Sequence, residues 1–283
     1  MDVEKVAPKL GAVVRGLDLA AGPSEAAMRA LIDLLHDRGF LVIPGQTLEP
    51  NSYLRFAWHW GRPLRFFLAA HRDGQLPEVI HVDNDPATPA AMRDGAVHWH
   101  SDSSYEEEPA AVTMLYGVEA PDEGGVTHFA STAAAYEALD EATKALIDPL
   151  VAVHELGGAP WIAGETPPDP NRPAHGLPPQ RHPLVMRHPV TGRKAIFTSG
   201  TACAIDGIEP LVATRLIHDL RAHIVRPEFR ASWKVTPGDL LLWDNFGTVH
   251  SASPIEYSDS PGKRRRLLRI STTGVPALCA AAA

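Results

Sequence analysis

Cysteine is scarce in this sequence: among 283 residues only Cys203 and Cys279 occur, and they lie far apart. Neither belongs to a Cys-x-x-Cys pair. The sequence therefore supports neither a disulfide framework nor a zinc site built from thiolates.

Long apolar runs are also missing. No stretch approaches the roughly 18 uninterrupted apolar residues that a membrane span requires. The N-terminal segment MDVEKVAPKLGAVVRG lacks the apolar core of a signal peptide. Together with the scarcity of cysteine, these absences predict a cytoplasmic protein that does not bind a membrane.

An excess of positive charge is absent as well. The chain has 26 Lys and Arg against 34 Asp and Glu, a formal net charge of −8. It therefore lacks the broad basic field on which nucleic-acid binding depends. The one basic cluster, Lys263 to Arg266 followed by Arg269, stands beside Leu267 and Leu268, which indicates a turn leading into a strand.

Apolar residues are plentiful, at 45% of the chain, which is enough for one large core. No shift in composition divides the sequence, so we expect a single domain over residues 1–283 with a C-terminal tail at about 275–283. We expect a homo-oligomer, a dimer or a tetramer, as its assembly.

Apolar periodicity and turn residues predict the order of the secondary structure. Strands are expected within 10–19 and at 40–43, 112–118, 184–187, 194–198, 232–235, 240–243 and 267–272, and helices at about 25–37, after 51, at 132–147 in two pieces broken near 140, and at 210–224. Many short strands combined with helices predict an α+β protein built on a β-sandwich or jelly roll.

Residues 155–183 are rich in Gly and Pro. A loop of this length is uncommon inside a compact domain and is usually either a functional lid or disordered. We predict a mobile flap here, with plain surface disorder as the alternative.

The most informative stretch is His98-Trp99-His100-Ser101-Asp102. Residues two apart on a strand project to the same face, so His100 and Asp102 can reach one ion together. His250 follows the apolar run 240–243 and is expected at a strand end, as the third ligand. Two imidazoles and one carboxylate suit Fe(II) and leave room for a bidentate 2-oxo acid and dioxygen. His98 shares the direction of His100, so spacing alone leaves the choice between them open.

Several linked segments carry a resemblance to a known family. The segments are WHSD at 99–102, GGVTHFAS at 124–131, RHPVTGRKAIF at 187–197, LLLWDNFGTVH at 240–250 and RRRLLRISTTG at 264–274. Their order and spacing along the chain are similar to those of the family's own motifs. The set, which extends over about 11–274, resembles the taurine/2,4-dichlorophenoxyacetate dioxygenase family. The resemblance implies a double-stranded β-helix (jelly-roll) fold and a reaction that uses Fe(II), 2-oxoglutarate and dioxygen to hydroxylate a small organic anion. Succinate and carbon dioxide are released.

The resemblance also assigns roles residue by residue. It implies that the metal is held by His100, Asp102 and His250. Thr127 matches the residue that hydrogen-bonds the far carboxylate of 2-oxoglutarate, and Arg265 matches the salt-bridge partner of that carboxylate. Arg269 matches an arginine that faces the iron-side carboxylate and the substrate anion.

The arginine assignments agree with elementary chemistry. Arginine is always ionised and can bind a carboxylate through two N–H groups. Residues four apart on a strand share a face, so Arg265 and Arg269 are expected to point inward together. Arg264 and Arg266 are then expected to face solvent. A one-residue slip of the strand would place Arg266 inside instead.

The substrate end of the family pattern departs from taurine-selective members. Those members have a His, a Tyr and an Asn at positions that correspond here to Phe66, Ala69 and Ala96. Taurine itself is therefore disfavoured. Phe66, Phe67, Trp161 and Phe246 are candidates for an apolar substrate pocket, although for each of them taken alone ordinary core packing is the favoured interpretation. His98 and Arg269 are candidates for substrate contact.

Two alternatives remain to hydroxylation, or to the cleavage that can follow it. A desaturase or another oxidative variant would use the same scaffold. A non-catalytic jelly-roll protein, a metal-dependent binding protein or sensor, would keep the fold without the reaction. The presence of Asp102 argues against halogenation, because halogenating relatives replace this carboxylate with a small residue.

Overall fold

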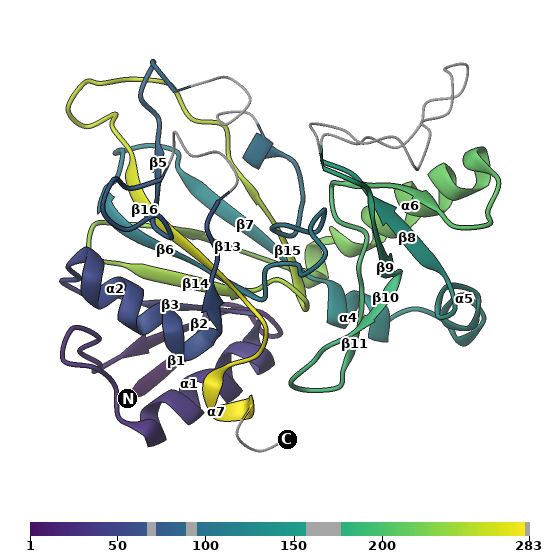
Figure 1. Ribbon diagram of the computed structural model, residues 1–283, viewed down its shortest axis with the longest axis horizontal. Helices are drawn as coiled ribbons and strands as arrows, with labels where there is room; N and C mark the ends of the chain where they lie inside the picture. The colour runs from purple at the N-terminus through teal and green to yellow at the C-terminus, as the bar shows by residue number, and fades with distance from the viewer. Residues whose placement is uncertain (67–71, 89–94, 157–176, 281–283) are drawn as a thin grey trace.

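The computed structural model describes residues 1–66, 72–88, 95–156 and 177–280 (Figure 1). The strands are β1 (Asp2–Lys5), β2 (Ala12–Arg15), β3 (Phe40–Ile43), β4 (Arg62–Pro63), β5 (Ile80–Asp83), β6 (Val112–Glu119), β7 (Val126–Ser131), β8 (Val151–His154), β9 (Gln180–Pro183), β10 (Val185–Arg187), β11 (Lys194–Ile196), β12 (Ala202–Ile205), β13 (Arg230–Lys234), β14 (Leu240–Asp244), β15 (Thr248–Ala252) and β16 (Arg266–Thr273). The α-helices are α1 (Glu25–Arg38), α2 (Pro50–Ala57), α4 (Thr132–Glu137), α5 (Glu141–Ile147), α6 (Pro210–Ile224) and α7 (Ala277–Ala280), and short 3-10 turns are η1 (Trp58–Trp60), η3 (Gly95–Val97) and η4 (Pro227–Phe229). In this part of the chain no helix is long and apolar enough to span a bilayer.

The largest sheet has the order β1-β2-β3-β14-β6-β16-β4, and β5 pairs with β16. All of its pairs are antiparallel except β2 with β3. A second sheet has the order β13-β7-β15. The two sheets share an apolar core in which the rings of Phe40 and Phe129 stack 4.3 Å apart and Trp243 lies 5.6 Å from Phe129.

The other face of the large sheet is covered by α1 and α2 (Figure 1). Successive side chains of a strand point to opposite faces, so Leu240 and Leu242 pack toward the helices while Leu241 and Trp243 enter the core between the sheets. Strand β14 is therefore buried on both sides, which explains why it is a continuous apolar run rather than an alternating one.

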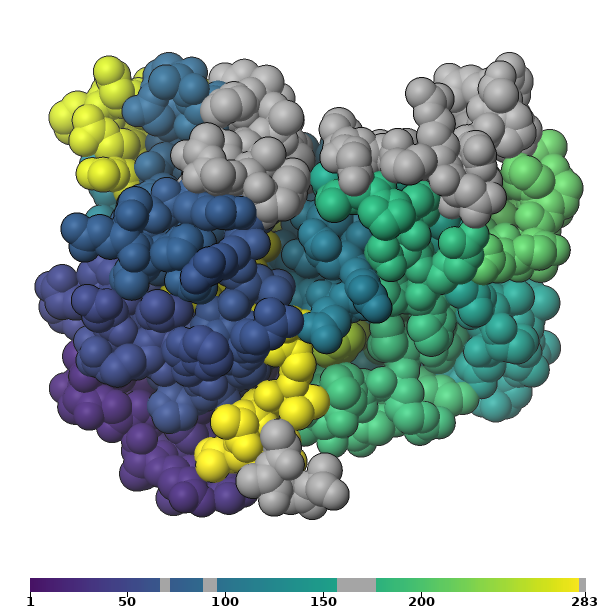
Figure 2. Space-filling model, viewed as in Figure 1, coloured from purple at the N-terminus to yellow at the C-terminus, as the bar shows by residue number. Residues whose placement is uncertain are grey.

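A further group of elements lies on the right-hand side of the view, around α6 (Figure 1). It consists of the sheet β12-β8-β9, the hairpin β10-β11, and helices α4 and α6, which share their own apolar cluster. The C-terminal segment with α7, yellow in Figures 1 and 2, crosses the lower front of the molecule and lies against η1.

Most of the expected elements form, and capping residues define the ends of the helices. Ser24 caps α1 by accepting a hydrogen bond from the backbone N–H of Ala27, and Gly39 ends the helix with a φ of 71°. The break in 132–147 falls at Asp140, whose carboxylate caps α5. Helix α6 has the expected bounds, Pro210–Ile224.

Four expectations about the site region need correction or lie outside the described chain. The stretch from His98 to Asp102 is a loop with one bridge at His100, not a strand. His250 lies in the middle of β15 rather than at a strand end. The last six residues of GGVTHFAS form β7, which had not been expected, because polar residues interrupt its apolar pattern. Most of the predicted flap, residues 157–176, lies outside the described residues.

A buried polar cluster fixes the turn between β14 and β15. Asp244 is 2% exposed, and its Oδ2 lies 3.2 Å from Nε2 of His188. Nδ1 of His188 accepts hydrogen bonds from two backbone N–H groups, so Nε2 carries the proton that faces Asp244. The ring of His36 meets His188 edge-on at 4.7 Å, and its buried Nδ1 has no hydrogen-bond partner among the described residues.

His36 makes the metal-free protein sensitive to acid. Burial, helped by His188, lowers the pKa of His36 from 6.5 to about 4. Between these values the unfolded chain binds a proton that the folded chain refuses, so stability falls as the pH falls through this window. The loss amounts to about 2 kcal/mol at pH 5.

The substitution His36→Leu should remove this loss, because it leaves no hydrogen bond unmade. We expect the difference in unfolding free energy between pH 7.5 and pH 5 to shrink by about 2 kcal/mol in urea titrations of the metal-free protein. The same change at His218, which is exposed on α6, should leave the difference as it is. An unaltered pH dependence in His36→Leu would show that His36 does not titrate on unfolding.

Candidate metal centre

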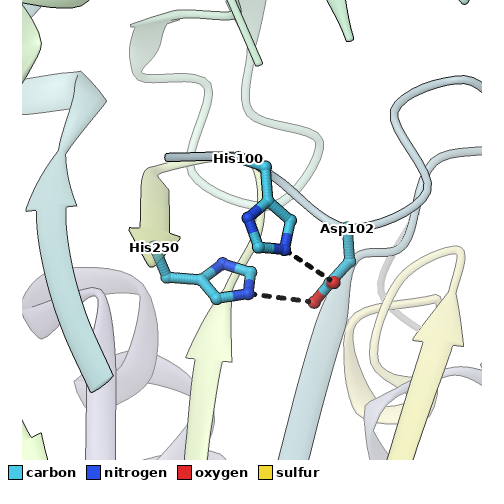
Figure 3. Close-up of side chains that lie close together, drawn as sticks. All are labelled: His100, Asp102 and His250. Atoms are coloured by element: carbon cyan, nitrogen blue, oxygen red, sulfur yellow. Dashed lines mark ion pairs between the residues drawn. The ribbon is translucent and has the colours of Figure 1, made fainter. Parts of the chain in front are cut away.

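Two histidines and one aspartate converge where the loop before β6 crosses β15. The backbones of His100 and His250 exchange two hydrogen bonds, of 2.9 and 2.8 Å, which set their rings 4.2 Å apart. Asp102 completes the group: its Oδ1 lies 3.8 Å from Nε2 of His100 and its Oδ2 lies 3.7 Å from Nε2 of His250 (Figure 3). Within the described ranges, no other set of three such side chains has its donor atoms as close, within 4.8 Å.

His100 presents a lone pair to this point, and His250 presents a neutral imidazole. Nδ1 of His100 lies 2.7 Å from the carbonyl oxygen of His98, so Nδ1 carries the proton and Nε2 is free to bind a metal. His250 is buried against Trp243, at 4.6 Å between ring centres. Burial, with the nearby His100, lowers the pKa of His250 to about 3. His250 is therefore neutral at physiological pH, as a ligand must be.

The carboxylate of Asp102 is ionised and half satisfied. Burial alone would raise its pKa, but Arg269, and after it His250 and His100, outweigh burial and hold the pKa well below the usual range. Nη2 of Arg269 lies 2.7 Å from Oδ1 of Asp102. Oδ2 is buried and has no hydrogen-bond partner among the described residues.

A bound cation fits this arrangement. A buried carboxylate oxygen without a partner is costly, and a metal ion would satisfy it. Two imidazole nitrogens and one carboxylate oxygen are the donors that non-haem Fe(II) centres use. The donor chemistry of His100, Asp102 and His250 therefore matches the metal expected from the sequence.

The loop and strands next to the metal ligands bring Thr127 and Arg265 to one end of β7. Thr127 is 6% exposed and pairs with Ala252, which lies two residues beyond His250. The side chains of Thr127 and His250 therefore lie on the same face of the sheet. A Cβ atom added to Gly125 would lie 3.9 Å from Cδ of Arg265. The stem of Arg265 therefore passes close to the start of the strand that carries Thr127.

The three neighbouring arginines differ in exposure. Arg266 is exposed and Arg265 is partly buried. The side chain of Arg264 is 39% exposed and pairs loosely with Glu119 at 3.9 Å. Strand β16 begins only at Arg266, with an irregularity before Leu267. Arg265 thus precedes the strand, and the expected reason for its direction, a shared strand face with Arg269, is wrong.

Asn84, which the sequence analysis missed, orders the loop that leads to Arg265. It is 2% exposed, and its Oδ1 accepts a 2.7 Å hydrogen bond from the backbone N–H of Arg265. Its Nδ2 donates to the carbonyl oxygens of Glu256 and Lys263. No local pattern could reveal this role, because the partners lie 172 to 181 residues away in sequence.

A cavity of about 290 Å³ adjoins Arg269. Phe66 and Tyr105 are among its lining residues. The two other substrate candidates stand apart from this lining: His98 is exposed, and Phe246 lies edge-on to His188 at 5.7 Å. Phe67, Ala69 and Trp161 lie outside the described residues.

The fold and the site define a class: an α+β protein in which two histidines and one carboxylate are grouped as the ligands of non-haem iron oxygenases are. Residues 2–271 match the model of the family described as "Taurine catabolism dioxygenase TauD, TfdA family". The chain belongs to this family.

Individual relatives agree. The chain is 33% identical over 260 residues to an (S)-phenoxypropionate/alpha-ketoglutarate-dioxygenase of Sphingobium herbicidovorans, covering 89% of each protein. It is 30% identical over 287 residues to the alpha-ketoglutarate-dependent 2,4-dichlorophenoxyacetate dioxygenase of Cupriavidus pinatubonensis, covering 94% of this chain and 95% of that one. Among solved structures, AAD-2 in complex with Mn(II) and N-oxalylglycine superposes with a TM-score of 0.78 at 26% identity, covering 97% of each chain.

The choice between His98 and His100 can be tested by metal binding. We expect His100→Ala, Asp102→Ala and His250→Ala each to abolish stoichiometric Fe(II) binding in anaerobic titrations. His98→Ala should bind Fe(II) like the unmodified protein, because the hydrogen bond between these residues uses the backbone carbonyl of His98, which alanine keeps. Loss of binding in His98→Ala with retention in His100→Ala would contradict the ligand set.

Proposed function

We propose that this chain is an Fe(II)- and 2-oxoglutarate-dependent dioxygenase that hydroxylates a small organic anion and releases succinate, and that it forms one double-stranded β-helix domain. The observation that carries the proposal is the group of His100, Asp102 and His250. Within this group, Oδ2 of Asp102 is buried and has no hydrogen-bond partner among the described residues. Bound Fe(II) would supply the centre at which 2-oxoglutarate and dioxygen react.

Thr127 and Arg265 are proposed to hold the far carboxylate of 2-oxoglutarate. The guanidinium of Arg265 can donate two parallel hydrogen bonds to a carboxylate, and the hydroxyl of Thr127 can donate a third. Asn84 supports this role, because it fixes the backbone of Arg265 before β16 begins. A prearranged cation lowers the entropic cost of binding the dianion.

Arg269 is proposed to serve both the metal ligand and the substrate. Its Nη2 is engaged by Asp102 and Ser271, while its buried Nε has no hydrogen-bond partner among the described residues. Arg269 also lines the 290 Å³ cavity, so an anionic substrate group in the cavity would be in place to accept a hydrogen bond from Nε of Arg269. The carboxylate, sulfonate or sulfate of a substrate would then lie next to the metal centre.

The substrate is proposed to have an apolar body. Phe66 lines the cavity at a position where taurine-selective members have a polar residue. Relatives are named for phenoxypropionate, for 2,4-dichlorophenoxyacetate and, at 30% identity, for sulfate esters. The first two names describe a carboxylate joined to an aryl ether, and the third describes an anionic sulfate ester, so we favour substrates of these kinds over taurine.

Succinate formation tests the proposal. The Fe(II)-loaded protein would be incubated with 2-oxoglutarate, dioxygen and one candidate at a time: aryloxyalkanoates, sulfate esters, sulfonates and amino-acid derivatives. We expect at least one aryloxyalkanoate or sulfate ester to raise succinate release together with an oxygenated or cleaved product. Succinate with an unsaturated product would instead indicate a desaturase. No succinate above background with any candidate, in protein that binds Fe(II), would favour a non-catalytic sensor.

The proposed 2-oxoglutarate contact makes a specific prediction. Removing one partner of a desolvated ion pair costs about 3–5 kcal/mol, so Arg265→Ala should weaken 2-oxoglutarate binding by roughly two to three and a half orders of magnitude. Thr127→Ala loses a single hydrogen bond and should weaken it only by about three- to tenfold. The anaerobic Fe(II) protein would be titrated with 2-oxoglutarate and followed by its charge-transfer absorption band.

Arg266→Ala is the matched control, because this neighbouring arginine is exposed. Its affinity for 2-oxoglutarate should remain that of the unmodified protein. If Arg266→Ala weakens binding and Arg265→Ala does not, the assignment of the arginine is off by one residue.

A further inference from the structure

A ring of hydrogen bonds among polar side chains surrounds Asp102. It runs from the backbone N–H of Asp102 to Asn245, then to Thr113, Ser271 and Arg269, and returns to the carboxylate of Asp102. We call this ring the Asn245 circuit. Apart from Arg269, its members are at most 6% exposed. A buried polar network of this kind stabilises one arrangement only when all its members are bonded, so its connectivity matters.

Asn245 is the member with the most fully determined role. It is 1% exposed in the turn that follows β14. Its Oδ1 accepts two hydrogen bonds of 3.1 Å, from the backbone N–H of Asp102 and from Nε1 of Trp243. Both partners are obligatory donors, so the amide can be oriented only this way, and Nδ2 must point to Oγ1 of Thr113, at 3.0 Å.

Thr113 and Ser271 connect Asn245 to Arg269 across two paired strands. Thr113 of β6 and Ser271 of β16 are register partners, and their hydroxyl oxygens lie 2.9 Å apart. Since Oγ1 of Thr113 accepts a hydrogen bond from Nδ2 of Asn245, the hydroxyl hydrogen of Thr113 is available to donate a hydrogen bond onward. Oγ of Ser271 accepts a hydrogen bond of 3.2 Å from Nη2 of Arg269.

The circuit therefore holds Asp102 at two points. Asn245 fixes its backbone N–H, and Arg269, itself held by Ser271, fixes Oδ1 of its carboxylate. With both points fixed, Oδ2 is the oxygen left without a partner, and it faces His250 at 3.7 Å. The circuit thus selects which carboxylate oxygen is presented to a metal.

We propose that Asn245 and Thr113 are positioning residues for the metal centre, which act by orienting Asp102 and Arg269 and do not touch the metal or the substrate. The inference rests on the metal centre of the proposed function but not on the reaction. It goes beyond the ligand set, because it assigns a role in metal affinity to two residues that contribute no ligand atom.

Thr113→Val tests this role, because valine has the shape of threonine without the hydroxyl. Mn(II) affinity would be measured by the electron paramagnetic resonance signal of free Mn(II), at a temperature where circular dichroism shows the variant to be folded. Loss of an outer partner of a metal ligand typically weakens binding 10- to 100-fold, and we expect a loss of about this size. Thr113→Ser keeps the hydroxyl and should restore most of the lost affinity.

Thr214→Val is the matched control. Oγ1 of Thr214 on α6 is buried and has no hydrogen-bond partner in the described chain, so this change removes a hydroxyl outside the circuit. Its Mn(II) affinity should equal that of the unmodified protein, even if its melting temperature changes. A purely structural role for Thr113 would likewise change the melting temperature and leave the affinity alone.

Asn245→Leu gives a second, independent measurement, since it leaves the N–H groups of Asp102 and Trp243 without an acceptor. We expect its Mn(II) affinity to fall at least as far as that of Thr113→Val. Unchanged affinity in both variants, alongside normal binding by the unmodified protein, would overturn the circuit and leave the metal centre intact. Failure of the unmodified protein to bind Mn(II) or Fe(II) would overturn both the proposed metal centre and the role of the Asn245 circuit.

Discussion

The arrangement of the site depends on the charge of Asp102, a carboxylate that is only 4% exposed. A buried charge is tolerated only when opposite charge and hydrogen bonds surround it, because water can no longer solvate it. Arg269 supplies the charge on one oxygen, and the two imidazoles face the group from the other side. The unpartnered Oδ2 is the residual cost, and a divalent cation would remove it. The metal centre and the burial of Asp102 thus explain each other.

The two-sheet architecture places the groups that this carboxylate needs. Strand β15 carries His250 against the core of Phe129 and Trp243, and one backbone bridge attaches the His100 loop to it. Behind β15, the Asp244 and His188 pair secures the turn from which Asn245 reaches Asp102. Asp244 and Asn245, which are adjacent in sequence, therefore contact different parts of the structure. Asp244 anchors the turn to the hairpin β10-β11, and Asn245 anchors the ligand loop.

Much of the fold follows from local sequence, because local forces determine it. Helix α6 and the break between helices near Asp140 were predicted correctly, and the apolar run of β14 reflects burial on both faces. Strand β7 was missed because polar and apolar residues mix along it. The three ligand residues were predicted from the sequence, but the preference for His100 over His98 came only from the family resemblance. Asn84, Thr113 and Asn245 could not be found, because each acts on a partner more than 130 residues away.

A crystal structure of the protein with Mn(II) and N-oxalylglycine, the amide analogue of 2-oxoglutarate, tests the account most directly. We expect one Mn(II) ion, identified by its anomalous signal, bound to Nε2 of His100, Oδ2 of Asp102 and Nε2 of His250. The far carboxylate of the analogue should be paired with Arg265. A Mn(II) ion bound to His98, or an analogue whose far carboxylate contacts Arg266 instead of Arg265, would contradict these assignments.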